Sequence, residues 1–167
     1  MLEQVTKQIF KELFTELSEI IEREDALRKR GKPCYNITSS LKDELSLAKT
    51  LVNVMDGSGV SDLLNQISVF FLEFKKQFKN RNTKFILKIH KCFHCVDEDP
   101  QKKCICGPNK KNSHIYCSMF IQSPTFTTLK GILKEALKSG KKGAEDIDII
   151  YDYLESIYAL IEKHKQR

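Results

Sequence analysis

Apolar residues recur at steps of three and four over most of this chain, and this spacing points to a helical fold. Residues 2–29 give the longest example, where Leu13, Leu17 and Ile20 belong to one continuous apolar stripe. Because an α-helix has 3.6 residues per turn, the stripe lies along one face and has to be buried against other elements. Gly31 and Pro33 end this predicted helix.

Four more segments show the same period. We expect helices from Ser40 to Met55, from about Ser61 to Asn80, from Thr127 or Thr128 to Leu137, and from about Ala144 onward. Phe70, Phe74 and Phe78 lie along one face of the third helix. They could line a ligand pocket, but aromatic residues at helical spacing usually pack between helices, so we expect them in the core.

The period changes in two places. Phe85, Leu87 and Ile89 alternate with more polar neighbours, which predicts a short strand over Thr83–His90. A second strand is predicted over His114–Ile121. The 23 residues between them contain four cysteines. A two-stranded ribbon is only marginally stable in water, so we expect an additional element to hold its open end together.

The cysteine-rich stretch has the composition of a zinc site. Cys92 and Cys95 form a Cys-x-x-Cys turn that can direct two sulfurs at one ion, and zinc requires two further ligands for its tetrahedral shell. Spacing alone does not decide which residues supply them. We expect one structural zinc ion, with two ions or none as alternatives. The candidate ligands are Cys92, Cys95, Cys104, Cys106, His114 and Cys117.

Three other histidine and cysteine residues have simpler interpretations. His90 and His94 are more typical of strand residues or second-shell donors than of zinc ligands. Cys34 is far away in sequence and is expected to be a small buried residue. Abundant thiolates reduce the Lewis acidity of zinc, and the chain has no HExxH helix or deaminase pattern, so we expect no catalytic role.

The expected location of the chain supports zinc over disulfides. No apolar run reaches the roughly 18 residues that a membrane span needs. Glu3, Lys7 and Lys11 interrupt the first turns, which excludes a signal-peptide core there. We therefore expect an intracellular protein, cytoplasmic or nuclear, in which clustered cysteines bind metal. In a secreted protein the six cysteines could instead form disulfides, and Asn36 could be glycosylated.

These observations predict a mainly α fold in one domain over residues 1–167. About five helices form a small bundle, and one zinc-stapled β-hairpin or loop is inserted between the third and fourth helices. The expected parts are N-terminal helices over 1–81, a zinc-binding ribbon over 82–122 and C-terminal helices over 123–167.

Positive charge is concentrated around the cysteines. Residues 75–111 have eleven basic and three acidic residues, a net charge of +8 in a chain whose total is +6. This focusing indicates an anionic partner, although it could also be the solvated rim of a metal module. The basic residues are Lys75, Lys76, Lys79, Arg81, Lys84, Lys88, Lys91, Lys102, Lys103, Lys110 and Lys111.

Two functions fit these features. The first is a non-enzymatic, zinc-stabilised protein-interaction module, adaptor or regulatory, with a protein partner. The second is a nucleic-acid-binding protein in which the basic segment 75–111 contacts phosphates and an exposed aromatic side chain stacks on a base. Lysine predominates over arginine and no finger has the spacing of the common DNA readers, so protein interaction is the preferred hypothesis.

Overall fold

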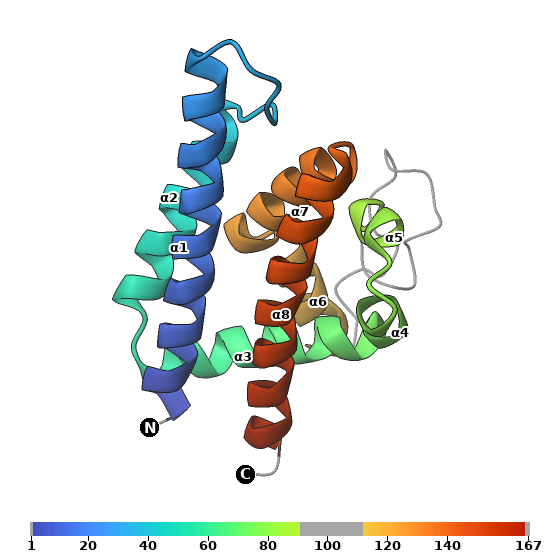
Figure 1. Cartoon of the computed structure of the whole chain (residues 1–167). Helices are drawn as coiled ribbons and strands as arrows, with labels where there is room; N and C mark the ends of the chain where they lie inside the picture. Colours follow the sequence, from blue (N-terminus) through green and yellow to red (C-terminus); the bar gives the residue numbers. More distant parts are fainter. Residues whose placement is uncertain (1, 91–111, 166–167) are drawn as a thin grey trace.

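A computed structural model describes residues 2–90 and 112–165, with the side chains of all of these except 112–115 and 165. This part of the chain contains eight helices, which confirms the mainly α fold class. They are α1 (Leu2–Lys29), α2 (Ser39–Val54), α3 (Gly57–Glu73), α4 (Lys75–Lys79), α5 (Thr83–Leu87), α6 (Asn112–Ile121), α7 (Pro124–Leu137) and α8 (Gly140–Lys165). Figure 1 shows α1 beside α2 and α8, with α3 crossing the bundle.

Side-chain caps set the starts of three helices. Thr38, Asp56 and Ser123 precede α2, α3 and α7, and in each the side-chain oxygen accepts a hydrogen bond from the backbone N–H three residues later. Such caps satisfy amide groups that have no partner within the helix. All three helices therefore begin slightly before the residues that the apolar periodicity predicted.

Phe70 of α3 lies at the centre of the aromatic core. Its ring contacts Phe74, the residue directly after α3, and also Phe120 of α6 and Phe126 of α7, with centroid distances of 5.1, 4.8 and 4.9 Å. These separations are those at which aromatic rings attract one another in tilted and edge-on arrangements. Phe70 and Phe74 are buried, which confirms the core interpretation for these two residues.

The strand predicted over Thr83–His90 is wrong. Thr83–Leu87 forms helix α5, and the Asn82 side chain caps it by accepting from the Phe85 N–H. Thr83 and Ile86 of α5 are both buried, whereas Phe85 is only partly buried. A three-residue step between buried side chains belongs to a helix, and it outweighs the alternation that suggested a strand.

The strand predicted over His114–Ile121 is also wrong, because these residues lie in α6. Cys117, Phe120 and Ile121 are buried at the three- and four-residue steps of a helix. The sequence hides this period because apolar residues fall on all sides of α6, including Met119, which is exposed. No β-strand occurs within the described ranges, so the zinc-stapled hairpin between the third and fourth helices is not supported.

The third predicted helix is divided in two. Phe74 leaves the helical region, with φ −114° and ψ 23°, so α3 ends at Glu73 and α4 begins at Lys75. This break, together with the helical conformation of the two expected strands, gives eight helices in place of about five.

A buried polar cluster ties the loop after α1 to α8. The Glu24 carboxylate accepts hydrogen bonds from the Tyr35 backbone N–H at 2.8 Å, from Lys142 Nζ at 2.7 Å and from Arg23 Nε at 2.8 Å. Asp146 accepts from both terminal nitrogens of Arg23 and from the Tyr35 hydroxyl. Ionic groups with this many partners are compatible with burial and fix the relative position of the elements that carry them.

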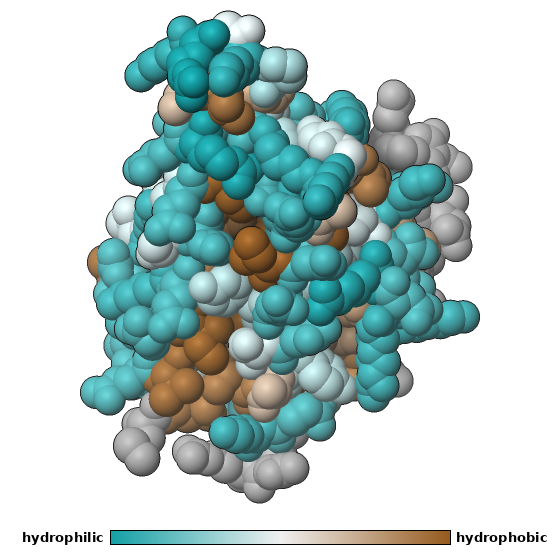
Figure 2. Space-filling view, viewed as in Figure 1, coloured by the Kyte–Doolittle hydropathy of each residue, from teal (hydrophilic) through white to brown (hydrophobic). Residues whose placement is uncertain are grey.

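Polar and charged side chains cover most of the face drawn in Figure 2, and an apolar patch lies beside the first turns of α1, where Val5 is exposed. None of the described helices combines the length and the apolar content required to cross a bilayer.

Candidate binding cleft and lysine-rich surface

Helices α4 and α5 carry a lysine-rich surface. It consists of Lys75, Lys76, Lys79, Lys84 and Lys88, all of which are exposed. None of the five forms a salt bridge with an acidic residue in the described part of the chain. We call these five residues the α4–α5 lysine surface. Of the other predicted basic residues, Lys91, Lys102, Lys103, Lys110 and Lys111 lie outside the described residues.

Arg81 differs from these lysines because it is turned toward α8. Its guanidinium lies 3.0 Å from Asp148, 3.0 Å from Asp152 and 2.9 Å from Glu155, and 5.5 Å from the centroid of the Tyr151 ring. The backbone of Arg81 has φ +47°, a left-handed conformation that costs a non-glycine residue about 1 kcal/mol. Arg81 therefore connects the α4–α5 turn to α8 and is engaged by three carboxylates.

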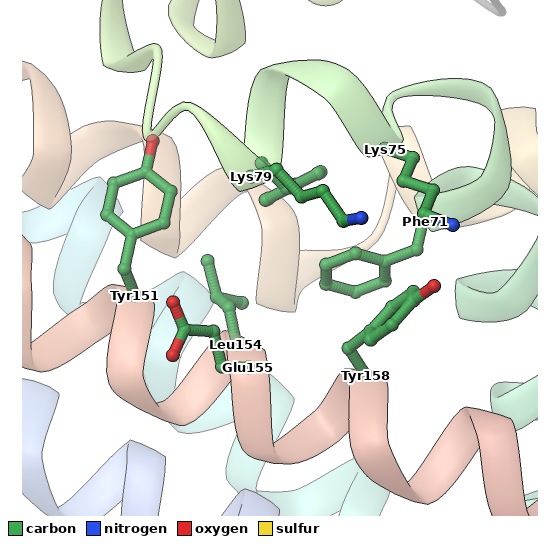
Figure 3. A pocket seen from close by; sticks show the side chains of 8 residues that line it. Phe71, Lys75, Lys79, Tyr151, Leu154, Glu155 and Tyr158 are labelled. Carbon is green, nitrogen blue, oxygen red and sulfur yellow. The ribbon is translucent and has the colours of Figure 1, made fainter.

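A cleft of about 270 Å³ lies between α4 and α8, next to the lysine surface (Figure 3). Aromatic rings form much of its wall: the Phe71 centroid is 4.4 Å from that of Phe78 and 6.1 Å from that of Tyr158. Its lining residues are Phe71, Lys75, Phe78, Lys79, Tyr151, Leu154, Glu155 and Tyr158.

The two lysines of α4 give the rim of the cleft a positive charge. Figure 3 shows Lys75 and Lys79 extending from α4 over the aromatic side chains, with Glu155 on the α8 side. The Lys75 Nζ atom lies 6.0 Å from the centroid of the Tyr158 ring. Glu155 shares Arg81 with Asp148 and Asp152, so its charge is only partly compensated. An entering group therefore meets two ammonium groups on the α4 side of an apolar wall and one carboxylate on the α8 side.

Tyr151 is held in place at the end of the cleft. Its hydroxyl shares a 3.1 Å hydrogen bond with Thr83 Oγ1, which links α8 to the start of α5. Burial raises the pKa of the Tyr151 phenol, so this group stays neutral. It therefore serves as a fixed part of the wall and not as a source of charge.

Most of the predicted zinc ligands lie outside the described residues. This applies to Cys92, Cys95, Cys104 and Cys106, while His114 lies in α6 with an undescribed side chain. Cys117 is buried in α6. Within the described ranges no three histidine, cysteine or acidic side chains are arranged to hold a metal ion. The zinc site stays a prediction, and its His114–Cys117 pair belongs to a helix, where residues three apart share a face.

His90 has a geometry that sequence reasoning did not assign to it. Its Nδ1 atom lies 2.7 Å from the carbonyl oxygen of Lys88. A carbonyl can only accept, so Nδ1 donates, and in the tautomer that carries only this proton Nε2 has a lone pair. That Nε2 atom is buried and has no hydrogen-bond partner among the described residues. Zinc-binding histidines commonly have this arrangement, in which a carbonyl fixes the opposite ring nitrogen.

Lys130 fixes the backbone next to His90. Its Nζ atom donates a 2.6 Å hydrogen bond to the carbonyl oxygen of Ile89, which joins the end of α5 to α7. Burial lowers the pKa of the Lys130 amine, although its contact with the Phe126 ring at 5.6 Å offsets part of the lost hydration. The position immediately before His90 is thus anchored to the helical body.

The cleft also escaped sequence reasoning. Tyr151, Leu154 and Tyr158 fall within the helix predicted from about Ala144 onward, where nothing marked them as lining a cleft, and Phe78 was expected in the core. The available signal was the interleaving of lysines 75 and 79 with phenylalanines 71 and 78, which places charge beside aromatic rings on neighbouring turns.

Comparisons with protein-family models, curated proteins and solved structures yield no match to this chain.

Proposed function

We propose that this chain is a non-enzymatic protein-interaction module whose α4–α5 lysine surface binds an acidic segment of a partner protein. One observation carries the proposal: five exposed lysines without acidic partners among the described residues adjoin an apolar cleft. Unpaired charges of one sign attract and orient an oppositely charged partner, and an adjoining apolar cleft supplies the desolvated contact that gives a complex its affinity.

Nucleic acid is the alternative ligand for the same surface, and two features disfavour it. Arg81 is engaged by carboxylates. The aromatic rings of the cleft stand between helices, whereas base stacking on a strand needs an open ring face.

Zinc belongs to this proposal as a structural element. It would hold residues 92–117 against the helical body, with ligands from Cys92, Cys95, Cys104, Cys106, His114 and Cys117. His90 now joins these candidates, since its Nε2 lone pair is fixed and unpartnered among the described residues. A structural zinc site uses four protein ligands and leaves no open position for a substrate.

Binding of short anionic probes tests the proposal. The probes are a fluorescein-labelled glutamate-rich peptide, a lysine-rich peptide of equal length and a single-stranded DNA of similar charge. The test variant combines Lys76→Glu, Lys79→Glu and Lys84→Glu. Its control combines Lys11→Glu, Lys134→Glu and Lys141→Glu, three exposed lysines that lie outside α4 and α5 and undergo the same change of charge.

We expect the glutamate-rich peptide to bind the unmodified protein and the control variant with similar affinity. Its affinity for the test variant should be at least about tenfold lower, because three charge contacts are lost. The lysine-rich peptide should not bind. Binding of the DNA in preference to the peptide would favour the nucleic-acid alternative. Equal binding of the peptide to both triple variants, or no binding at all, would overturn the proposal.

A further inference from the structure

The cleft between α4 and α8 differs from the lysine surface in being lined mainly by carbon. Phe71, Tyr151 and Leu154 are buried at its base. Phe78 and Tyr158 are only partly buried and pack against the core. Each of these two rings therefore has surface that the fold itself does not cover, and both surfaces border the same cleft.

The size of the cleft restricts what can enter it. At about 270 Å³ it lies just below the range of pockets that hold whole drug-sized molecules. One planar side chain fits such a space. The ring separations around it, 4.4 Å between Phe71 and Phe78 and 6.5 Å between Phe78 and Tyr151, belong to the tilted and edge-on geometries that a further aromatic ring can join.

The charges at the rim of the cleft determine which residues of the partner can lie next to that side chain. Lys75 and Lys79 line the cleft, and neither has an acidic partner among the described residues. The acidic group on the other side, Glu155, already accepts from Arg81 at 2.9 Å. An anion on the α4 side of the entering ring gains charge contacts with Lys75 and Lys79, whereas a cation there would be repelled.

We infer that this cleft is the anchor subsite for one aromatic side chain of an acidic protein segment, with a carboxylate next to that side chain bound by Lys75 and Lys79. The inference rests on the proposed function and adds the type of residue, an aromatic one, that fixes the position of the partner on the surface. The more distant acidic residues of the segment then contact Lys76, Lys84 and Lys88. The cleft therefore determines the position at which the segment binds, and the lysine surface supplies the general electrostatic attraction.

Three small probes separate the ring from the charge: phenylacetate, phenethylamine and acetate. Their binding is measured by titration into isotope-labelled protein with amide chemical shifts as the readout. We expect phenylacetate alone to produce saturable shifts that centre on α4 and on residues 151–158 of α8. Acetate lacks the ring and phenethylamine carries the wrong charge, so both should bind at least about tenfold more weakly.

Two matched pairs of variants locate the binding. Lys79→Glu and Lys84→Glu make the same charge change, but only Lys79 lines the cleft. Tyr158→Ala and Tyr153→Ala remove the same atoms from partly buried tyrosines of α8, and only Tyr158 lines the cleft. We expect Lys79→Glu and Tyr158→Ala each to weaken phenylacetate about fivefold or more, and the two controls to leave it unchanged.

The outcomes distinguish this inference from the proposed function. If the glutamate-rich peptide binds the lysine surface while phenylacetate gives no saturable shift, or binds equally to both members of each pair, the anchor subsite is wrong and the proposed function stands. A glutamate-rich peptide with one central phenylalanine should also bind more tightly than the same peptide with alanine. Equal affinity of these two peptides, or a stronger response to single-stranded DNA, would overturn the inference.

Discussion

Glu24 is a buried carboxylate whose charge is stabilised by its partners. Burial alone would raise the pKa of Glu24, but hydrogen bonds from Lys142, the Tyr35 backbone and Arg23 together hold it below its ordinary value of 4.5. Because the pKa is lower in the folded than in the unfolded chain, ionised Glu24 stabilises the fold above about pH 4.5. This contribution is lost as the pH falls through the lower, folded-state pKa.

Glu24→Gln should therefore destabilise the protein in a pH-dependent way. We expect a loss of about 2 kcal/mol in the free energy of unfolding at neutral pH, because the substitution leaves buried donors without a charged acceptor. The loss should be smaller at about pH 3 than at neutral pH, because the lowered pKa of Glu24 contributes less to stability once the pH is below the unfolded-state value of 4.5. Urea unfolding at the two pH values measures it. Glu22→Gln, an exposed neighbour on α1, should have little effect at either pH, and a pH-independent loss for Glu24→Gln would contradict the argument.

At the scale of the elements, the corner between α7 and α8 depends on one close approach. A Cβ atom at Gly143 would lie 1.7 Å from the backbone carbonyl oxygen of Ala136. Because the contact joins the backbone of α8 to the backbone of α7, neither side can move away without separating the two helices. Gly143 thus allows α8 to begin directly against the end of α7, which places the face carrying Tyr151 and Tyr158 opposite α4.

Gly143→Ala should destabilise the protein by about 3 kcal/mol, although replacing a helical glycine by alanine usually stabilises a helix by up to about 1 kcal/mol. Thermal or urea unfolding gives the measurement. Gly131→Ala is the control: its Cβ would meet only the tip of the Leu41 side chain, at 2.6 Å, and this tip can rotate away. A stability change below about 1 kcal/mol is expected there. If both variants behave alike, the close approach does not determine the corner.

The elements also show where sequence reasoning succeeds. The stripe over residues 2–29 predicted α1 with its observed bounds, because a long amphipathic helix repeats the same signal many times. Segments of five to ten residues repeat it only once or twice. In α5 the alternation of Phe85, Leu87 and Ile89 in the sequence concealed the three-residue step from Thr83 to Ile86, and in α6 apolar residues on all sides left no period to read.

The candidate site was harder to predict than the helices. Its cleft joins residues 71–79 to residues 151–158, which are far apart in the chain and meet only because α3 ends at Phe74 and α8 passes α4. Each lining residue satisfies the pattern of its own helix, so nothing local marks it as functional. The charge excess of residues 75–111 did indicate the lysine surface, but it could not reveal that Arg81 is withdrawn from it by three carboxylates on α8.

At the scale of the whole molecule, the described residues form an extensive hydrophobic core without the segment that carries most of the predicted zinc ligands. The core of the described residues joins α1, α2, α3, α6, α7 and α8, and Cys117 is the one predicted ligand within it. Small zinc fingers unfold without metal because they have almost no other core. This chain has an extensive one, so zinc should stabilise residues 92–117 locally and contribute little to the helical body.

Removal of zinc tests this division. We expect the purified protein to contain about one zinc ion per chain, and His90→Ala to lower that content while His164→Ala, a histidine on α8 that contacts Asn65, does not. After chelation the far-ultraviolet circular dichroism should keep nearly all of its helical signal, and urea should still produce a cooperative transition. Loss of that transition would mean that metal binding and folding of the helical body are one process. Protein that is zinc-free when purified and that takes up no added zinc would exclude the metal site itself.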